Sequence, residues 1–160
     1  MKRLIIYYSY TGSTAKMAEK LAEKRGCPAL QVKDKQKPGR LRVFSMGVLA
    51  SLRGVGWETE QLDWPAEIEH ITVMSPVWAG RVTPQINTVL SALPVGKQVE
   101  IILVSGQGRK RENYSGKLDI AVRERGCTLA GIQHVRGGLA KQLEDGQKAD
   151  SGDENEGAGG

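Results

Sequence analysis

Three hydroxyl side chains and a glycine lie between an apolar run and a helical pattern near the start of the chain. Residues 9–14 read SYTGST, after LIIYY and before AKMAEKLAEKRG. The hydroxyls of Ser9, Thr11 and Thr14 can donate to an anion, and Gly12 lets the backbone fold closely around it. A helix that begins here also directs its free N–H groups and the positive end of its dipole at the loop. The pattern predicts a phosphate site.

Helix capping by Ser13 or Thr14 is the alternative explanation for these hydroxyls. Neither residue is followed three positions later by Glu or Gln, so no capping box would occupy the N–H groups. Lys16 falls in the first helical turn, where its charge opposes the dipole of an empty helix and favours a bound dianion. These details favour the anion, and capping remains open.

A second loop, SPVWAGRVTP at 75–84, follows the apolar run ITVM. Pro76 stiffens the exit from the strand, and Gly80 permits a close approach. Trp78 is a large flat side chain on which a planar aromatic ligand would stack. A tryptophan folded back onto the sheet is the alternative.

A third loop, SGQGRKRENYSG at 105–116, follows the run VEIILV. Long loops in a compact domain are usually functional or mobile. Tyr114 offers a second aromatic face, with a plain surface tyrosine as the alternative. The cluster Arg109–Arg111 places cations in this loop.

The sequence lacks the residue patterns of several other kinds of binding site. The GxxxxGK[ST] phosphate loop is absent, and GVG and GQG are incomplete dinucleotide patterns. Cys27 and Cys127 lie far apart in the sequence, with no CxxC and no clustered histidines, so we expect buried thiols rather than a metal site or a redox dithiol.

Short apolar runs alternate with helical patterns along the chain, which is typical of an α/β protein with a doubly wound five-stranded parallel sheet. The predicted strands are 3–8, 29–32, 71–74, 99–104 and 128–135. The predicted helices are 14–25, 82–93 and 115–125, with a weak one at 139–145. The basic segment 40–53 is predicted as a helix with Leu41, Phe44, Val48 and Leu52 on one face; it either covers the sheet or lies on a membrane surface.

The chain divides into a folded domain, 1–143, and an acidic, glycine-rich tail, 144–160, that is expected to be disordered. The tail holds six of the 18 acidic residues and one of the 23 basic ones, which leaves 22 Lys and Arg against 12 Asp and Glu in the domain, a net charge of +10. Such a surplus favours acidic partners. The first apolar stretch is too short for a signal peptide, so a cytoplasmic location is expected.

Taken together, the three loops resemble those of flavodoxin over roughly residues 1–138. The resemblance implies a flavodoxin-like sheet with strand order 2-1-3-4-5, flavin mononucleotide (FMN) as the cofactor, and no metal. It assigns the phosphate to Ser9, Tyr10, Thr11, Gly12, Ser13 and Thr14. It assigns one side of the flavin ring to Pro76, Val77, Trp78, Ala79 and Gly80. It assigns the other side to Ser105, Gly106, Gly108 and Tyr114.

The resemblance implies an electron carrier between redox partner proteins, and the basic domain predicts acidic docking surfaces on them. An FMN-dependent oxidoreductase that uses NAD(P)H or a quinone is an alternative, as is a flavodoxin-like binding module with a basic face. Nucleic acid and membrane surfaces are the less expected partners. Because flavodoxins are typically acidic, cations at Arg109–Arg111 predict a less negative potential for the reduced flavin than is usual for them.

Overall fold

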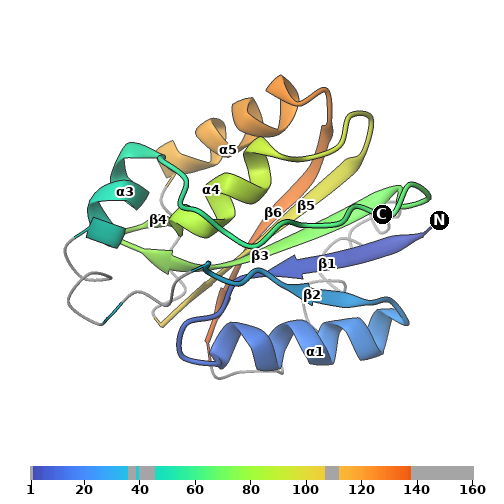
Figure 1. Ribbon diagram of the computed structural model, residues 1–160, viewed down its shortest axis with the longest axis horizontal. Coiled ribbons are helices and arrows are strands. Elements are labelled where there is room, and N and C mark those ends of the chain that lie inside the picture. The colour runs from blue at the N-terminus through green and yellow to red at the C-terminus, as the bar shows by residue number, and fades with distance from the viewer. Residues whose placement is uncertain (1, 36–38, 40–45, 107–111, 138–160) are drawn as a thin grey trace, which may run out of the picture.

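The computed structural model describes residues 2–35, 39, 46–106 and 112–137, which form a parallel sheet with helices on both faces (Figure 1). The strands are β1 Arg3–Tyr7, β2 Ala29–Gln31, β3 His70–Trp78, β4 Arg81–Val82, β5 Gln98–Ser105 and β6 Thr128–Arg136. The helices are α1 Ser13–Arg25, α3 Val48–Arg53, α4 Pro84–Ser91 and α5 Glu112–Glu124. The parallel strands run β2-β1-β3-β5-β6, which confirms the predicted order, and the short β4 pairs antiparallel with β3 as an addition.

The apolar runs form central strands because both of their faces are buried. Successive residues of a strand point to opposite faces, so Ile5 and Tyr7 pack with Met17 and Leu21 of α1. The alternate residues of β1 join the larger core under α4 and α5. Figure 1 shows α1 alone on one side of the sheet and α3, α4 and α5 on the other.

Strand β3 extends farther than predicted. Ser75 pairs with Leu103 and Pro76 with Val104, so β5 keeps β3 extended beyond the end of β1, where Tyr7 pairs with Met74. Positions 75–78, expected in a loop, are therefore strand. This extension carries Trp78 outward past the hydroxyl loop.

The predicted helix over 40–53 is described only in its second half, because 40–45 lie outside the described residues. Gly54, in a left-handed conformation, ends α3 through N–H bonds to Ala50 O and Ser51 O. The predicted apolar face is wrong at Leu52, which is 43% exposed, whereas Ser51 is buried. Helix α3 packs beside α4 and β4, which orients Ser51 rather than Leu52 inward.

Helix α5 begins at Glu112, earlier than predicted, so Tyr114 belongs to a helix and not to the preceding loop. Gly108 and Arg109–Arg111 lie outside the described residues, as do the predicted helix 139–145 and the acidic tail. Within the described part of the chain, no helix is long and apolar enough to cross a membrane.

Candidate functional site

The hydroxyl loop ends in a helix that no side chain caps. Gly12 is the N-cap of α1 with φ 95°, a conformation that L side chains rarely adopt, and no side-chain hydrogen bond caps the helix. The capping interpretation for Ser13 and Thr14 is therefore wrong. The left-handed glycine starts the helix one residue before Ser13, which places both hydroxyls inside the first turn. The N-terminus of α1 therefore remains directed at the hydroxyl loop.

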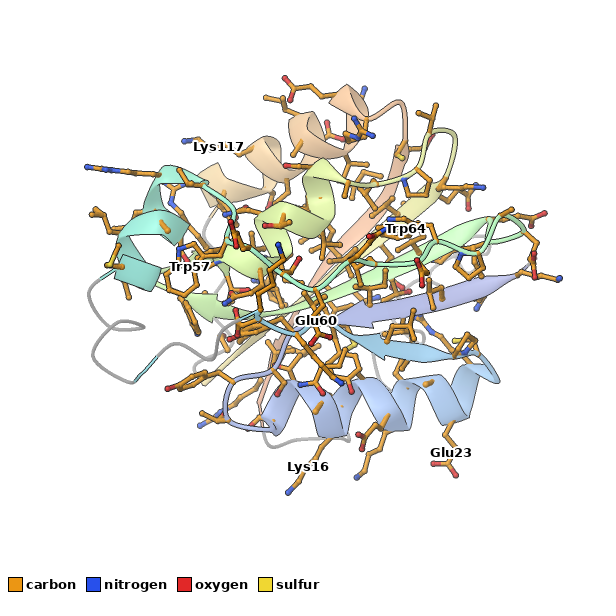
Figure 2. The ribbon with its side chains drawn as sticks, viewed as in Figure 1. Lys16, Glu23, Trp57, Glu60, Trp64 and Lys117 are labelled. Carbon is orange, nitrogen blue, oxygen red and sulfur yellow. The ribbon has the colours of Figure 1, made fainter. Side chains whose placement is uncertain are left out.

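The hydroxyls of the loop differ in their surroundings. Ser9 Oγ accepts a hydrogen bond from the Gly12 N–H at 3.1 Å, which folds the loop back on itself and leaves the Ser9 O–H to donate elsewhere. Thr14 is buried at the base of the loop, whereas Thr11 is exposed. Lys16 points away from the sheet into solvent (Figure 2), so in this conformation it adds only a distant charge.

A tight hairpin follows Trp78. Trp78 pairs with Arg81, and the two residues between them, Ala79 and Gly80, have φ values of 50° and 78°. Two left-handed residues in succession are typical of a two-residue hairpin turn. Ala79 is the one non-glycine residue with positive φ in the described chain, and such strain concentrates at functional sites.

Trp78 brings the hairpin and the hydroxyl loop together. Its ring centroid lies 6.0 Å from that of Tyr8 at 83°, and 6.1 Å from that of Tyr10 at 87°. Both contacts are edge-to-face, the favoured geometry for aromatic pairs. The indole packs partly against the larger core and is half-buried. The indole is thus anchored to the sheet on one side, as the alternative interpretation expected, and stacking of a planar ligand on its other side stays a prediction.

Tyr114 of α5 contacts the hairpin. Its hydroxyl oxygen accepts a hydrogen bond from the Val82 N–H at 3.0 Å, and the Arg81 guanidinium lies 5.2 Å from the ring centroid. Burial, the largest influence, raises the pKa of the Tyr114 phenol, although the Val82 hydrogen bond and the Arg81 charge act in the opposite direction. One ring face is therefore already covered by a cation, and contact with a cofactor stays a prediction.

Two predicted residues, Ser105 at the end of β5 and Gly106 after it, lie at the same edge of the sheet. Ser105 O accepts from the Gly137 N–H at 2.8 Å, and Gly106 O accepts from Arg136 Nε at 3.3 Å. These bonds fix the backbone exit from β5 against the end of β6. The carboxyl ends of β1, β3 and β5 therefore meet, as the sequence predicted.

An aspartate after β2 belongs to this region and was missed by the sequence analysis. Asp34 accepts hydrogen bonds from the Tyr8 hydroxyl at 3.0 Å and from Gln85 Nε2 at 2.6 Å. Burial first, and then the Asp34 charge and hydrogen bond, raise the pKa of Tyr8 above its ordinary value. The only sequence signal was a charged stretch that follows the second strand, which is equally typical of a solvated turn.

A cleft of about 830 Å³ opens between the hydroxyl loop and the end of β2. Ser9, Thr11 and Gly12 line one side, and Asp34 and Glu60 line the other. Its size falls in the range of ordinary ligand pockets. Among the described residues, no three His, Cys, Asp or Glu side chains gather as a metal-binding group.

A scan against protein families finds no match to the sequence, and a search of curated proteins finds none either. The fold matches solved structures. A flavoprotein from Lactobacillus acidophilus NCFM in complex with FMN is 24% identical, with a TM-score of 0.69 over 92% of this chain and 97% of its own. A protein from Bacteroides eggerthii DSM 20697 described as a flavoprotein is 18% identical, with a TM-score of 0.76 over 95% and 99%. Oxidised flavodoxin 2 from Bacillus cereus is 17% identical, with a TM-score of 0.50 over 92% of each chain. The strand order and these likenesses together show that the chain has the flavodoxin-like fold.

Proposed function

We propose that the chain binds FMN at the carboxyl edge of its sheet and carries electrons between redox partner proteins. The observation that carries the proposal is that the loop with an uncapped helix N-terminus at Gly12 also contains Tyr10, whose ring contacts the half-buried indole of Trp78. A phosphate acceptor and an aromatic platform at adjacent strand ends fit the two halves of a flavin mononucleotide.

The phosphate half would lie in the hydroxyl loop. The free N–H groups at the start of α1 and the Ser9, Thr11 and Thr14 hydroxyls supply neutral donors, and the helix dipole adds a positive potential. Gly12 holds the backbone in the conformation that brings these donors together. A site built of backbone and hydroxyl donors is well suited to a dianion, because several hydrogen bonds and the helix dipole stabilise its charge.

The ring half would lie against Trp78, with Ser105 and Gly106 on the neighbouring strand end. When bound, the isoalloxazine ring supplies the capacity to accept and release electrons. This chain's residues hold the ring, exclude water from one face and leave its edge accessible. The half-buried Trp78 and the 41% exposed Tyr10 mark that accessible edge.

The accessible edge supports the transfer of electrons to a protein, because a partner must bring its own redox centre close. The net charge of +10 on residues 1–143 favours partners with acidic surfaces through long-range attraction. Faster electron transfer at low ionic strength than at high is the expected consequence.

The test is a titration of protein freed of flavin with FMN and with riboflavin, followed by flavin fluorescence. In this proposal the N-terminus of α1 binds the phosphate, which riboflavin lacks. We therefore expect FMN to bind at least about a hundredfold more tightly than riboflavin, as two charge-assisted hydrogen bonds would give. Trp78→Ala should weaken both ligands. Trp64→Phe, a half-buried indole elsewhere in the core, is the matched control and should change neither. A protein that stays colourless at high FMN concentration would overturn the proposal.

The carrier role is tested separately with the FMN-loaded protein. NAD(P)H alone should leave the flavin oxidised, whereas NADPH with a flavoprotein reductase should bleach it. Rapid bleaching by NAD(P)H alone would instead identify an oxidoreductase.

A further inference from the structure

Two tyrosines contact Trp78 with nearly the same geometry but in different surroundings. The Tyr8 and Tyr10 ring centroids lie 6.0 and 6.1 Å from that of Trp78, and both rings are close to perpendicular to the indole. Tyr8 is 3% exposed and Tyr10 is 41% exposed. The pair therefore differs in burial and in polar contacts while the distance to Trp78 is held constant.

The polar contact of Tyr8 is a carboxylate. Its hydroxyl donates to Asp34 Oδ2 at 3.0 Å, and Gln85 Nε2 holds the other carboxylate oxygen at 2.6 Å. Gln85 is fully buried, and the backbone of Asp34 bridges to Thr59, so the acceptor is fixed. The Tyr10 side chain is exposed, and no carboxylate of the described residues accepts a hydrogen bond from its hydroxyl.

A phenol that loses an electron becomes a strong acid and must release its proton at the same time. A carboxylate already hydrogen-bonded to the phenol is the group best placed to accept that proton. Loss of an electron from Tyr8 is therefore assisted within the fold, whereas Tyr10 must release its proton to solvent. Indole has no comparable requirement at the moment of oxidation, so Trp78 is oxidised first by an oxidant at the ring site.

We propose that Trp78, Tyr8 and Asp34 form a relay that moves a one-electron oxidation from the half-buried indole to the buried phenol. A one-electron oxidant at the ring site, for which an inorganic radical or a photoexcited flavin qualifies, takes one electron from Trp78 and is itself reduced. Tyr8 then passes one electron to the oxidised indole and its phenolic proton to Asp34. Trp78 is restored, and the products are a neutral tyrosyl radical and a protonated Asp34. Return of one electron and of the proton resets the relay.

The consequence for the protein is protection of its aromatic platform. An oxidised indole at the surface is open to attack by water and oxygen, and its loss would remove the platform. A phenoxyl radical with 3% exposure is shielded from both. The relay is a property of the apoprotein, so it does not depend on the proposed binding of FMN.

Pulse radiolysis of the flavin-free protein tests the relay, with azide radicals that oxidise indole in preference to phenol. We expect the tryptophyl absorption to decay as the tyrosyl absorption grows. The fast phase should disappear in Trp78→Phe and in Tyr8→Phe, and should persist in Tyr10→Phe, the matched control. Asp34→Asn should slow it by about tenfold or more, the rate equivalent of one charge-assisted hydrogen bond.

Asp34→Asn is compatible with the fold, because the unpartnered Gln85 Oε1 can turn to accept from the new amide N–H. Circular dichroism and the unfolding temperature establish that each variant is folded. If Tyr8→Phe does not fold, Asp34→Asn still tests the relay. Equal slowing by Tyr8→Phe and Tyr10→Phe would overturn the relay, as would an unchanged rate in Asp34→Asn.

Discussion

Gly47 packs directly against the indole of Trp78. A Cβ atom at position 47 would lie 3.5 Å from Cη2 of Trp57 and only 3.0 Å from Cζ3 of Trp78. The second distance is shorter than an ordinary van der Waals contact. Trp57 lies beside α3 (Figure 2). The turn before α3 and the end of β3 therefore meet at a position where an added Cβ would require the indole of Trp78 to shift.

Gly47→Ala should weaken FMN binding about tenfold without unfolding the protein. Gly47 has helical dihedrals, φ −68° and ψ −43°, so alanine fits its backbone and gains up to about 1 kcal/mol of helix propensity, which offsets the crowding. The loss of FMN affinity would come from the displacement of the Trp78 indole by the added methyl group. Near-ultraviolet circular dichroism and FMN titration measure it.

Gly116→Ala is the control for that substitution. Gly116 lies in α5 with nothing within 4 Å of its added Cβ, so the same propensity gain comes with no crowding. It should stabilise the protein and leave FMN binding unchanged. Equal FMN affinities for the two variants would show that Gly47 does not position Trp78.

Gly12→Ala should weaken FMN binding far more than it weakens the fold. The φ of 95° forces alanine into a conformation that costs about 1–2 kcal/mol, and the loop is expected to relax out of the donor arrangement. Gly26→Ala, at the other end of α1 with φ 60° and ψ 41°, meets a backbone penalty of the same kind, although its dihedrals are less unfavourable for alanine than those of Gly12. Urea unfolding should report a loss of stability for each variant, whereas FMN titration should report a loss of affinity for Gly12→Ala only. A similar loss of affinity in Gly26→Ala would mean that general destabilisation explains both.

The sheet was predictable because its strands are short runs that are apolar on both faces, and parallel packing requires that pattern. The place of the hydroxyl loop between β1 and α1 was predictable from the same alternation of apolar run and helical pattern, whereas phosphate binding there stays a prediction. Ala79 was not predictable in the same way. Its left-handed conformation is imposed by the hairpin pairing of Trp78 with Arg81, which local preference does not reveal.

Asp34 illustrates the other kind of miss. Its carboxylate is fixed by Tyr8 and Gln85, which lie 26 and 51 positions away in the sequence. Partners so distant come together only once the strand order is known. Sequence patterns report periodicity within an element, whereas polar pairs between elements depend on packing.

Tyr114→Phe should lower the free energy of unfolding by about 1–2 kcal/mol, the usual cost of an unpaired buried donor. Val82 is fully buried, and its N–H donates to the Tyr114 hydroxyl, which phenylalanine lacks. The aromatic ring is retained, so FMN affinity should change little. Tyr10→Phe, at an exposed position, is the control and should leave stability unchanged. Urea unfolding of both variants checks this, and equal stabilities would show that the Val82 bond does not hold the hairpin.

A buried ion pair lies on the α1 face of the sheet. Arg25 Nη1 is 2.7 Å from Glu100 Oε2, and Thr72 and Gln133 donate further hydrogen bonds to the same carboxylate. Burial acts to raise the pKa of Glu100, but the hydrogen bonds and charge of Arg25, together with the Thr72 hydrogen bond and the His70 charge, more than offset it, and the pKa lies below its ordinary value of 4.5. The carboxylate therefore stays ionised although its side chain is only 12% exposed.

Arg25→Ala should destabilise the protein by about 3 kcal/mol at neutral pH, because it leaves Glu100 buried without its cation. A depressed pKa means that the unfolded chain binds the Glu100 proton more tightly than the folded protein does. The stabilisation is complete above the ordinary pKa of 4.5 and is lost as the pH falls through the lower folded value. Wild-type stability should thus fall more steeply below pH 4.5 than that of Glu100→Gln, which has no such proton to bind. Arg123→Ala removes an exposed pair with Asp119 and should cost less than about 1 kcal/mol at any pH. Urea unfolding across this pH range checks the set, and parallel curves for wild type and Glu100→Gln would show that the ion pair does not couple folding to protonation.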